Sequence, residues 1–297
     1  MIPQTLLHLA IIFKLYEQYL RDSVFKQKNV ILNEFFKRYN LKRIVFKVGS
    51  SVLTETTGIA KVRMLNLVSL IAECKKIYEV ILISSGAVAA GYTALKLDRN
   101  QQISKKVLAS VGQPILMSSY KNKFDIYDVD TSQILLTEED FDSRKHTEIF
   151  QQIIDTTLKN DILPIVNEND ISTTPEQLFG DNDQLSAHVA HYTNADMLII
   201  LSDIEGYYDS NPNSNPKAKI RKVVNEIKEE ELGQEHTPNS QFATGGIVTK
   251  LKAAEYIMNQ NREMFLCSGF DLTTAREFLI DKVHNKGTLF TNKKETK

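Results

Sequence analysis

From Arg43 onward the chain alternates short apolar runs with stretches whose apolar residues recur at helical spacing. The runs predict strands at residues 43–48, 80–83, 133–136, 162–166, 197–201, 264–267 and 288–290. Helical patterns cover residues 62–77, 105–124, 143–158 and the stretch after 246, with an interruption expected near Pro114. Repeated strand–helix units favour a mostly parallel sheet with helices on both faces. We therefore expect an α/β fold, a three-layer αβα sandwich around one central sheet.

The first 40 residues differ from the rest, because they read as one or two amphipathic helices. Two interpretations stay open: an appended helix that packs on the domain or on a partner subunit, or a start codon assigned too early. We expect residues 1–40 to be an N-terminal helical extension without chemistry. No Pro-, Gly- or Ser-rich linker divides residues 41–297, which predicts a single domain there.

Composition narrows the function classes. The chain has 297 residues with 36 Lys+Arg against 37 Asp+Glu, and a net charge of -1 makes nucleic acid an improbable partner. The apolar run at residues 6–13 is too short to cross a bilayer and lacks the features of a signal peptide. The two cysteines, Cys74 and Cys267, lie in apolar patterns and favour buried thiols in a reducing cytoplasm. We expect a cytoplasmic protein that binds neither nucleic acid nor membrane.

Two polar clusters lie between the strand at 162–166 and the helical pattern around Leu185. They are Asn167 to Asp170 and Gly180 to Asp183, and we call residues 167–183 the floor loop. The second cluster stands at the expected start of a helix. Acidic groups gathered on one loop are costly unless they face a cation or orient lysines. We interpret the floor loop as the base of an active site.

Small residues follow several other strands, where the carboxyl ends of a parallel sheet form binding sites. Gly49 follows the strand that carries Lys47, Gly86 follows the second strand, and Gly246 precedes the helix that carries Lys250. Such turns expose backbone N–H groups at helix N-termini, which bind anions. With lysines from opposite ends of the sequence, this pattern suits a nucleoside triphosphate whose phosphoryl group needs positive charge on more than one side. The P-loop and protein-kinase motifs are absent.

Each signal alone has an ordinary structural interpretation. The turn at Gly86 is compatible with a simple tight turn, Gly245-Gly246 with a hinge, and residues 180–183 with a helix cap. His188 and His191 lie three residues apart, but no third ligand is placed near them, so we expect no zinc site. The residues alone therefore leave the function open.

Five motifs in order are more specific than any one of them. They are FKVGSSVL (46–53), ISSGAVAAG (83–91), VNEND (166–170), GDNDQLSA (180–187) and TGGIVTK (244–250). Together they resemble the amino acid kinase superfamily and, within it, the glutamate 5-kinase family, over about residues 43–291. The resemblance implies ATP-dependent phosphorylation of the L-glutamate γ-carboxylate to L-glutamyl 5-phosphate, the first step of proline synthesis.

The resemblance also implies roles for individual residues. The catalytic residues would be Lys47, Asp183 and Lys250, with Asp183 holding the two lysines beside the transferred phosphoryl group. Glutamate would bind to Ser85, Asp170 and Asn182. ATP would contact Lys47, Gly49, Ser202, Asp203, Thr244, Gly245, Gly246, Ile247, Val248, Thr249 and Lys250, while Gly49 and Gly86 would let backbone amides approach the phosphates. No residue is predicted as a direct metal ligand, because Mg²⁺ would ride mainly on the nucleotide phosphates.

The residue types agree with such a substrate. A γ-carboxylate is already a nucleophile at pH 7, so positioning and electrostatics suffice for phosphoryl transfer. Asp170 suits the α-ammonium group of a free amino acid. A nucleoside monophosphate would favour arginines, and none lies between Leu163 and Ala190.

Further implications concern assembly and regulation. Many relatives carry a C-terminal PUA domain, which we expect to be absent because the sequence ends at Lys297. The resemblance implies feedback inhibition by proline at the glutamate pocket, transfer of the product to glutamyl phosphate reductase, and a homo-oligomer. Two alternatives remain: a sister kinase of the same fold with another acceptor, and a non-catalytic nucleotide-binding regulator.

Overall fold

The computed structural model describes residues 43–56, 58–98, 101–173, 182–212, 214–233 and 246–293. The predicted N-terminal extension, residues 1–40, lies outside this range. Among the described helices, none is long and apolar enough to cross a membrane.

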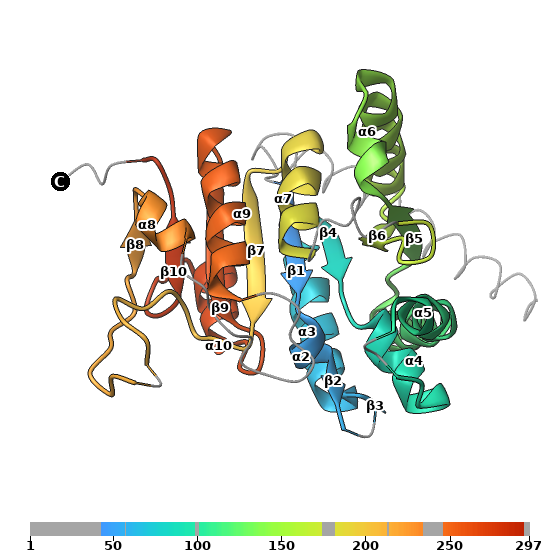
Figure 1. Ribbon diagram of the computed structural model, residues 1–297. Helices are drawn as coiled ribbons and strands as arrows, with labels where there is room; N and C mark the ends of the chain where they lie inside the picture. The colour runs from blue at the N-terminus through green and yellow to red at the C-terminus, as the bar shows by residue number, and fades with distance from the viewer. Residues whose placement is uncertain are drawn as a thin grey trace, which may run out of the picture. The chain divides into compact units, whose positions relative to one another are not determined.

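A single large sheet organises the described residues (Figure 1). Its eight strands lie in the order β5–β6–β4–β1–β7–β9–β10–β8. All neighbouring pairs are parallel except β9 and β10, which are antiparallel. The strands are β1 (Arg43–Val48), β4 (Glu79–Ser84), β5 (Thr131–Leu136), β6 (Leu163–Glu168), β7 (Met197–Ser202), β8 (Val223–Val224), β9 (Glu263–Ser268) and β10 (Thr288–Phe290). The predicted mostly parallel sheet is confirmed.

Helices cover both faces of this sheet, which confirms the three-layer prediction. The helices are α2 (Ser50–Leu53), α3 (Lys61–Cys74), α4 (Ala87–Leu95), α5 (Gln102–Phe124), α6 (Arg144–Lys159), α7 (Asn182–Tyr192), α8 (Glu229–Leu232), α9 (Ile247–Asn259) and α10 (Thr273–Arg276). Shorter elements are η1 (Asp125–Tyr127), η2 (Glu138–Phe141), the π-helical η4 (Glu277–Asp281) and a hairpin of β2 (Thr54–Glu55) and β3 (Gly58–Ile59). Figure 1 shows α7 and α9 side by side over the sheet.

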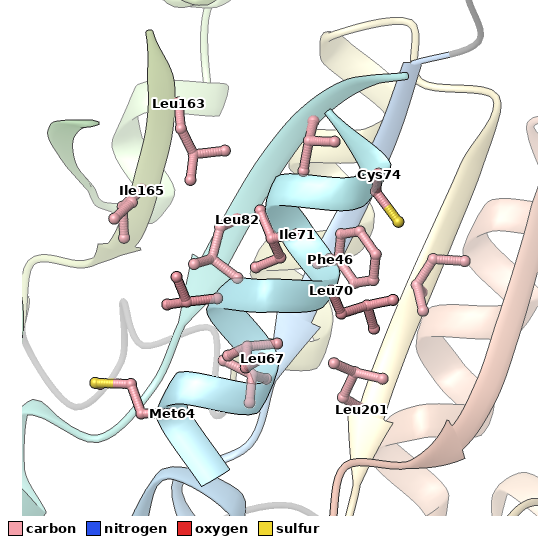
Figure 2. Packing of buried hydrophobic residues seen from close by; sticks show 14 of the residues in the cluster. Phe46, Met64, Leu67, Leu70, Ile71, Cys74, Leu82, Leu163, Ile165 and Leu201 are labelled. Carbon is pink, nitrogen blue, oxygen red and sulfur yellow. The ribbon is translucent and has the colours of Figure 1, made fainter. Parts of the chain in front are cut away.

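Alternation along the strands sends side chains into two separate cores. Ile44 and Phe46 of β1 join the core under α3, α5 and α10, whereas Val45 joins the core under α6, α7 and α9. Figure 2 shows the first core, with α3 residues such as Leu67 and Ile71 packed over strand residues such as Leu82. The same alternation places Lys47 on the face covered by α7 and α9.

Two boundaries differ from the sequence prediction. Helix α5 runs through Pro114 without a break, so the predicted interruption is wrong. Pro114 is exposed, as is Ser110, whose carbonyl would otherwise accept the missing helical hydrogen bond and can bind water instead. Strand β6 continues to Glu168, two residues beyond the predicted end, because pairing with β5 extends to Leu136 and Glu168.

Helices α4 and α5 approach each other unusually closely, and glycines make this possible. A Cβ atom on Gly91 would overlap the carbonyl oxygen of Leu108, and one on Gly112 would overlap that of Ala87. Gly86, which precedes α4, has φ 109°, a left-handed conformation that favours glycine. The small residues of this region therefore fix how the first turn of α4 meets the carboxyl end of β4.

The substitution Gly112→Ala should lower the free energy of unfolding by about 2 kcal/mol, since a methyl group forced against backbone outweighs the better helix propensity of alanine. Urea denaturation of both proteins measures the difference. Ser110→Ala on the exposed side of α5 is the control and should change stability by less than about 0.5 kcal/mol. Equal stability of Gly112→Ala and wild type would show that α4 and α5 can separate without cost.

Candidate active site

The carboxyl ends of three neighbouring strands are joined by backbone hydrogen bonds. The amide of Gly49, after β1, donates to the carbonyl of Leu201 in β7 at 3.2 Å. The amide of Ser85, after β4, donates to the carbonyl of Val48 at 3.2 Å. These bonds hold the three strand ends together at the edge of the sheet where ligands bind in parallel α/β folds.

The buried carboxylate of Asp183 holds two lysines at this edge. Lys47 from β1 donates to Oδ1 of Asp183, and Lys250 from α9 donates to Oδ2 at 3.1 Å. Asp183 is 0% exposed, Lys47 6% and Lys250 4%. The hydroxyl of Thr249 also donates to Oδ2, at 3.0 Å. The structure thus brings together the three residues predicted as catalytic, which we call the Asp183 cluster.

Electrostatics explain why these charges are stable together. Burial raises the pKa of Asp183, but the two ammonium groups outweigh burial and hold the pKa of this carboxyl well below its usual range. Asp183 is therefore ionised at neutral pH. The cluster thus gathers two ammonium groups around one carboxylate, and positive groups of this kind suit an anionic ligand.

A second polar group begins one residue earlier, at Asn182 in the first turn of α7. Its side-chain amide donates to the hydroxyl of Ser85 at 2.8 Å and to Oδ1 of Asn167 at 2.9 Å. The amide of Asn167 in turn donates to Gln113 of α5 at 3.0 Å. We call Ser85, Asn167, Asn182 and Gln113 the amide chain. It brings together two of the three predicted glutamate ligands.

The third predicted glutamate ligand, Asp170, follows β6 in the floor loop. Burial raises the pKa of Asp170 to about 6, while its own backbone amide and the charge of Lys106 act in the opposite direction. A carboxylate held in this way favours a cationic partner, because a positive charge beside it restores the ionised form.

The predicted ATP contacts that the structure describes lie at the carboxyl ends of β1 and β7 and at the start of α9. Ser202 ends β7 and donates to Asp203 at 2.9 Å. Gly246 precedes α9 in extended backbone, while Ile247, Val248 and Thr249 form the first turn of α9 and are half-buried. The hydroxyl of Thr249 is engaged with Asp183 and with the Gly246 carbonyl. Thr244 and Gly245 lie outside the described residues.

Gly49 has a different reason to be glycine than Gly86. Its backbone angles, φ -74° and ψ 153°, suit any residue. A Cβ atom there would meet protein atoms no closer than 3.8 Å. Neither the backbone conformation nor packing against the described residues requires glycine at this position, and the role of Gly49 beside a ligand stays a prediction.

Sequence reasoning missed several residues of the site. Asn167 was placed in the loop rather than at the end of β6, and Gln113 and Tyr120 of α5 carried no signal. The hydroxyl of Tyr120 lies 2.8 Å from that of Ser84, the last residue of β4, and so links α5 to the carboxyl end of this strand. Proximity across the fold, rather than local spacing, defines these contacts, so the sequence alone offered no means to find them.

His188 and His191 are packing residues in this structure. The ring of His188 stacks on Tyr256 of α9 at 4.7 Å, and that of His191 meets Tyr192 at 4.8 Å. Burial lowers the pKa of both imidazoles. Within the described part of the chain, no group of three or more His, Cys, Asp or Glu side chains could hold a metal ion.

Comparison with known proteins identifies the family. The sequence model of the amino acid kinase family matches residues 42–268. This chain belongs to the amino acid kinase family. The enzyme glutamate 5-kinase of Wolinella succinogenes is 52% identical over 255 residues, which cover 84% of this chain and 98% of that protein. The glutamate 5-kinase of Leishmania donovani is 47% identical, covering 84% of this chain and 95% of the relative.

Solved structures of other kinases share the fold at low sequence identity. Isopentenyl phosphate kinase of T. acidophilum matches with a TM-score of 0.58 at 14% identity, over 83% of this chain and 99% of that one. Carbamate kinase of Giardia lamblia matches with a TM-score of 0.57 at 18% identity, over 85% and 99%. These similarities support the αβα architecture and do not identify the substrate that accepts a phosphoryl group.

The substitution Asp183→Asn should lower the free energy of unfolding at pH 7 by about 3 kcal/mol, because it removes the negative charge to which two buried ammonium groups donate. The pKa of Asp183 is depressed in the folded state, so its contribution is present above the unfolded pKa of about 4 and is lost as pH falls below it. The loss is complete only when pH falls through the depressed folded pKa, so urea denaturation at pH 7 and pH 2.5 should show a difference that is smaller in acid.

Asp161→Asn is the matched control for this prediction. The Asp161 side chain is 92% exposed and pairs with Lys75 at 2.9 Å on the surface, where such pairs contribute little. A loss of stability in Asp183→Asn no larger than in Asp161→Asn would contradict the charge-balance interpretation of the Asp183 cluster.

Proposed function

We propose that this chain transfers the γ-phosphoryl group of ATP to the γ-carboxylate of L-glutamate, which gives L-glutamyl 5-phosphate and ADP and begins proline synthesis. The chain is a kinase with ATP as its co-substrate, as its family membership and its 52% identity to a glutamate 5-kinase indicate. The observation that carries the proposal is the junction at α7. There Asp183 binds two lysines while the adjacent Asn182 begins a chain of uncharged hydrogen-bonding groups.

The reaction needs no general base on the protein. The γ-carboxylate of glutamate is ionised at pH 7, so one of its oxygens attacks the γ-phosphorus directly. A carboxylate O–P bond forms as the bond to the ADP oxygen breaks, and ADP leaves with that electron pair. The residues of the site then act by positioning the two reactants and by balancing charge.

Lys47 and Lys250 supply positive charge from two directions. Asp183 binds each ammonium group with a different carboxylate oxygen, so the two lysines are held at separate positions. The negative charge that spreads over the phosphoryl oxygens in the transition state is stabilised between them. Their burial strengthens this interaction, because a site that excludes water screens charge weakly.

The acceptor side has the character that a zwitterionic amino acid requires. Ser85 and Asn182 offer uncharged hydrogen-bonding groups, while Asp170 offers a carboxylate for the α-ammonium group. A phosphorylated acceptor would meet the repulsion of Asp170 instead. This favours glutamate over a phosphate acceptor for the site.

Mg²⁺ accompanies ATP in this proposal and is bound by the nucleotide phosphates, where it neutralises part of their charge. The donor set is compatible with such an ion. The described residues contain no cluster of three carboxylate, imidazole or thiol groups that would cage a metal, and the fixed cations of the site are lysines.

Several implications of the family resemblance stay predictions. They are the single domain over residues 41–297, inhibition by proline, transfer of the product to glutamyl phosphate reductase, a homo-oligomeric assembly and a cytoplasmic location.

The decisive assay measures ADP release with ATP, Mg²⁺ and L-glutamate in the presence of hydroxylamine, which traps an acyl phosphate as the hydroxamate. Aspartate and N-acetylglutamate serve as parallel acceptors. Hydroxamate formed with glutamate alone supports the proposal. Turnover only with another acceptor would favour a sister kinase, and ATP binding without any turnover would favour a regulatory protein.

Lys250→Ala should reduce kcat by about 100-fold or more with little change in the KM for glutamate, because the lysine stabilises charge that develops in the transition state. The same hydroxamate assay under saturating substrates measures this. Lys252→Ala, two residues along α9 on an exposed position, is the control and should keep wild-type turnover. A wild-type kcat in Lys250→Ala would show that Lys250 does not stabilise the transferred phosphoryl group.

The KM for glutamate should rise as pH falls through about 6, because Asp170 is ionised above its pKa and loses its attraction for the α-ammonium group below it. Initial rates from pH 8 to pH 5.5 at saturating ATP give the profile. Asp170→Asn should show a high KM throughout and no rise in that window. A wild-type profile that matches the variant's would mean that Asp170 does not bind the ammonium group.

A further inference from the structure

Lys106 of α5 connects that helix to the floor loop. Its ammonium group donates to the carbonyl oxygen of Ile171 at 2.8 Å and to that of Thr173 at 2.7 Å. The side chain is half-buried, and two of its three hydrogens are used by backbone groups of a segment 65 and 67 residues away. Such charge-assisted bonds are stronger than neutral ones.

The segment that Lys106 binds is a turn that begins at the end of β6. The carbonyl of Asn169 accepts from the amides of Ser172 at 3.2 Å and Thr173 at 3.3 Å, so the backbone folds back on itself. The amide of Asn169 donates to Leu136 at 2.7 Å, which ties the start of the turn to β5. Lys106 binds the other end from α5. The turn is therefore fixed at both ends, and Asp170 lies between them.

Lys106 also acts on Asp170 through space. Burial raises the pKa of the Asp170 carboxyl, and the charge of Lys106 acts against that rise. Within the described part of the chain, two influences lower the pKa of Asp170. The larger is the hydrogen bond from its own backbone amide, and the other is the positive charge of Lys106. One lysine thus contributes both to the shape of the turn and to the charge that the turn presents.

We propose that Lys106 is a positioning residue for the acceptor amino acid: it holds the 169–173 turn so that the Asp170 carboxylate faces the α-ammonium group of the substrate. Lys106 binds backbone rather than substrate, so its effect passes through Asp170. This inference rests on the proposed function and assigns to α5 a part in selecting an acceptor with a free amino group.

Three substitutions separate the two contributions of Lys106. Lys106→Met removes the hydrogen bonds and the charge, Lys106→Gln keeps an N–H donor for the carbonyls and removes the charge, and Lys106→Arg keeps both. Lys121→Met is the control on the same helix. The Lys121 side chain is 50% exposed and pairs with Asp125 at the far end of α5.

Glutamate KM, ATP KM and kcat are measured for each variant by the hydroxamate assay from pH 5.5 to pH 8. Lys106→Met should raise the glutamate KM about tenfold at pH 8, the effect of losing hydrogen bonds to a charged group, with kcat and ATP KM near wild type. Lys106→Gln should bind glutamate almost normally at pH 8 but lose affinity at a higher pH than wild type does. Lys106→Arg and Lys121→Met should follow wild type.

A purely structural role would change the glutamate KM equally at every pH and would alter kcat and ATP KM with it, and that result would overturn the inference. A wild-type glutamate KM and pH profile in Lys106→Met would overturn it as well. Hydrogen exchange of the amides of Ser172 and Thr173 gives a readout independent of activity. Exchange should be faster in Lys106→Met than in wild type, and unchanged exchange would contradict the role of Lys106 in holding the turn.

The same design separates this inference from the proposed function. A wild-type enzyme that forms no glutamyl hydroxamate would refute the proposed function. Normal wild-type activity combined with unaltered Lys106 variants would refute the positioning role alone.

Discussion

The site depends on one carboxylate that binds two ammonium groups from distant parts of the chain. Lys47 is separated from Asp183 by 136 residues and Lys250 by 67, yet each reaches a different oxygen of the same group. The parallel sheet makes this possible, because the carboxyl end of β1 and the first turns of α7 and α9 come together at one edge. Isolated buried lysines would lose their charge, and Asp183 allows both to remain charged.

The two faces of the sheet carry different parts of the site. Alternation along β1 sends Val45 and Lys47 to the side of α7 and α9, where the Asp183 cluster forms. Asn167 of β6 reaches the other side, where Gln113 of α5 accepts its hydrogen bond. Asn182 and Asp183 join the two sides at the start of α7. The fold alone therefore does not determine the acceptor.

Much of this architecture followed from local sequence patterns. Buried strands such as β1 and β7 read as apolar runs, and small residues after them marked the binding edge. Motifs in family order predicted that Lys47, Asp183 and Lys250 act together, and the structure places them in contact. Two local predictions were wrong. Pro114 was expected to interrupt α5, but the carbonyl of Ser110, which loses its helical hydrogen bond, lies on an exposed residue. Strand β6 continues through Asn167 and Glu168, because pairing with β5 outweighs the polarity of these residues. The bonds from Asn167 to Gln113 and from Lys106 to the floor loop depend on helix placement, which the glycine contacts of α4 and α5 determine.

Asn182 and Asp183 are consecutive residues in one turn of helix, so their α-carbons are about 3.8 Å apart and cannot move independently. The residue proposed to contact the acceptor and the residue that binds the two lysines are therefore held at a fixed separation. Under the proposed function, an acceptor that contacts Asn182 lies at a set distance from the two lysines that Asp183 binds. Helix α7 thereby couples the proposed position of the acceptor to the position of the two lysines.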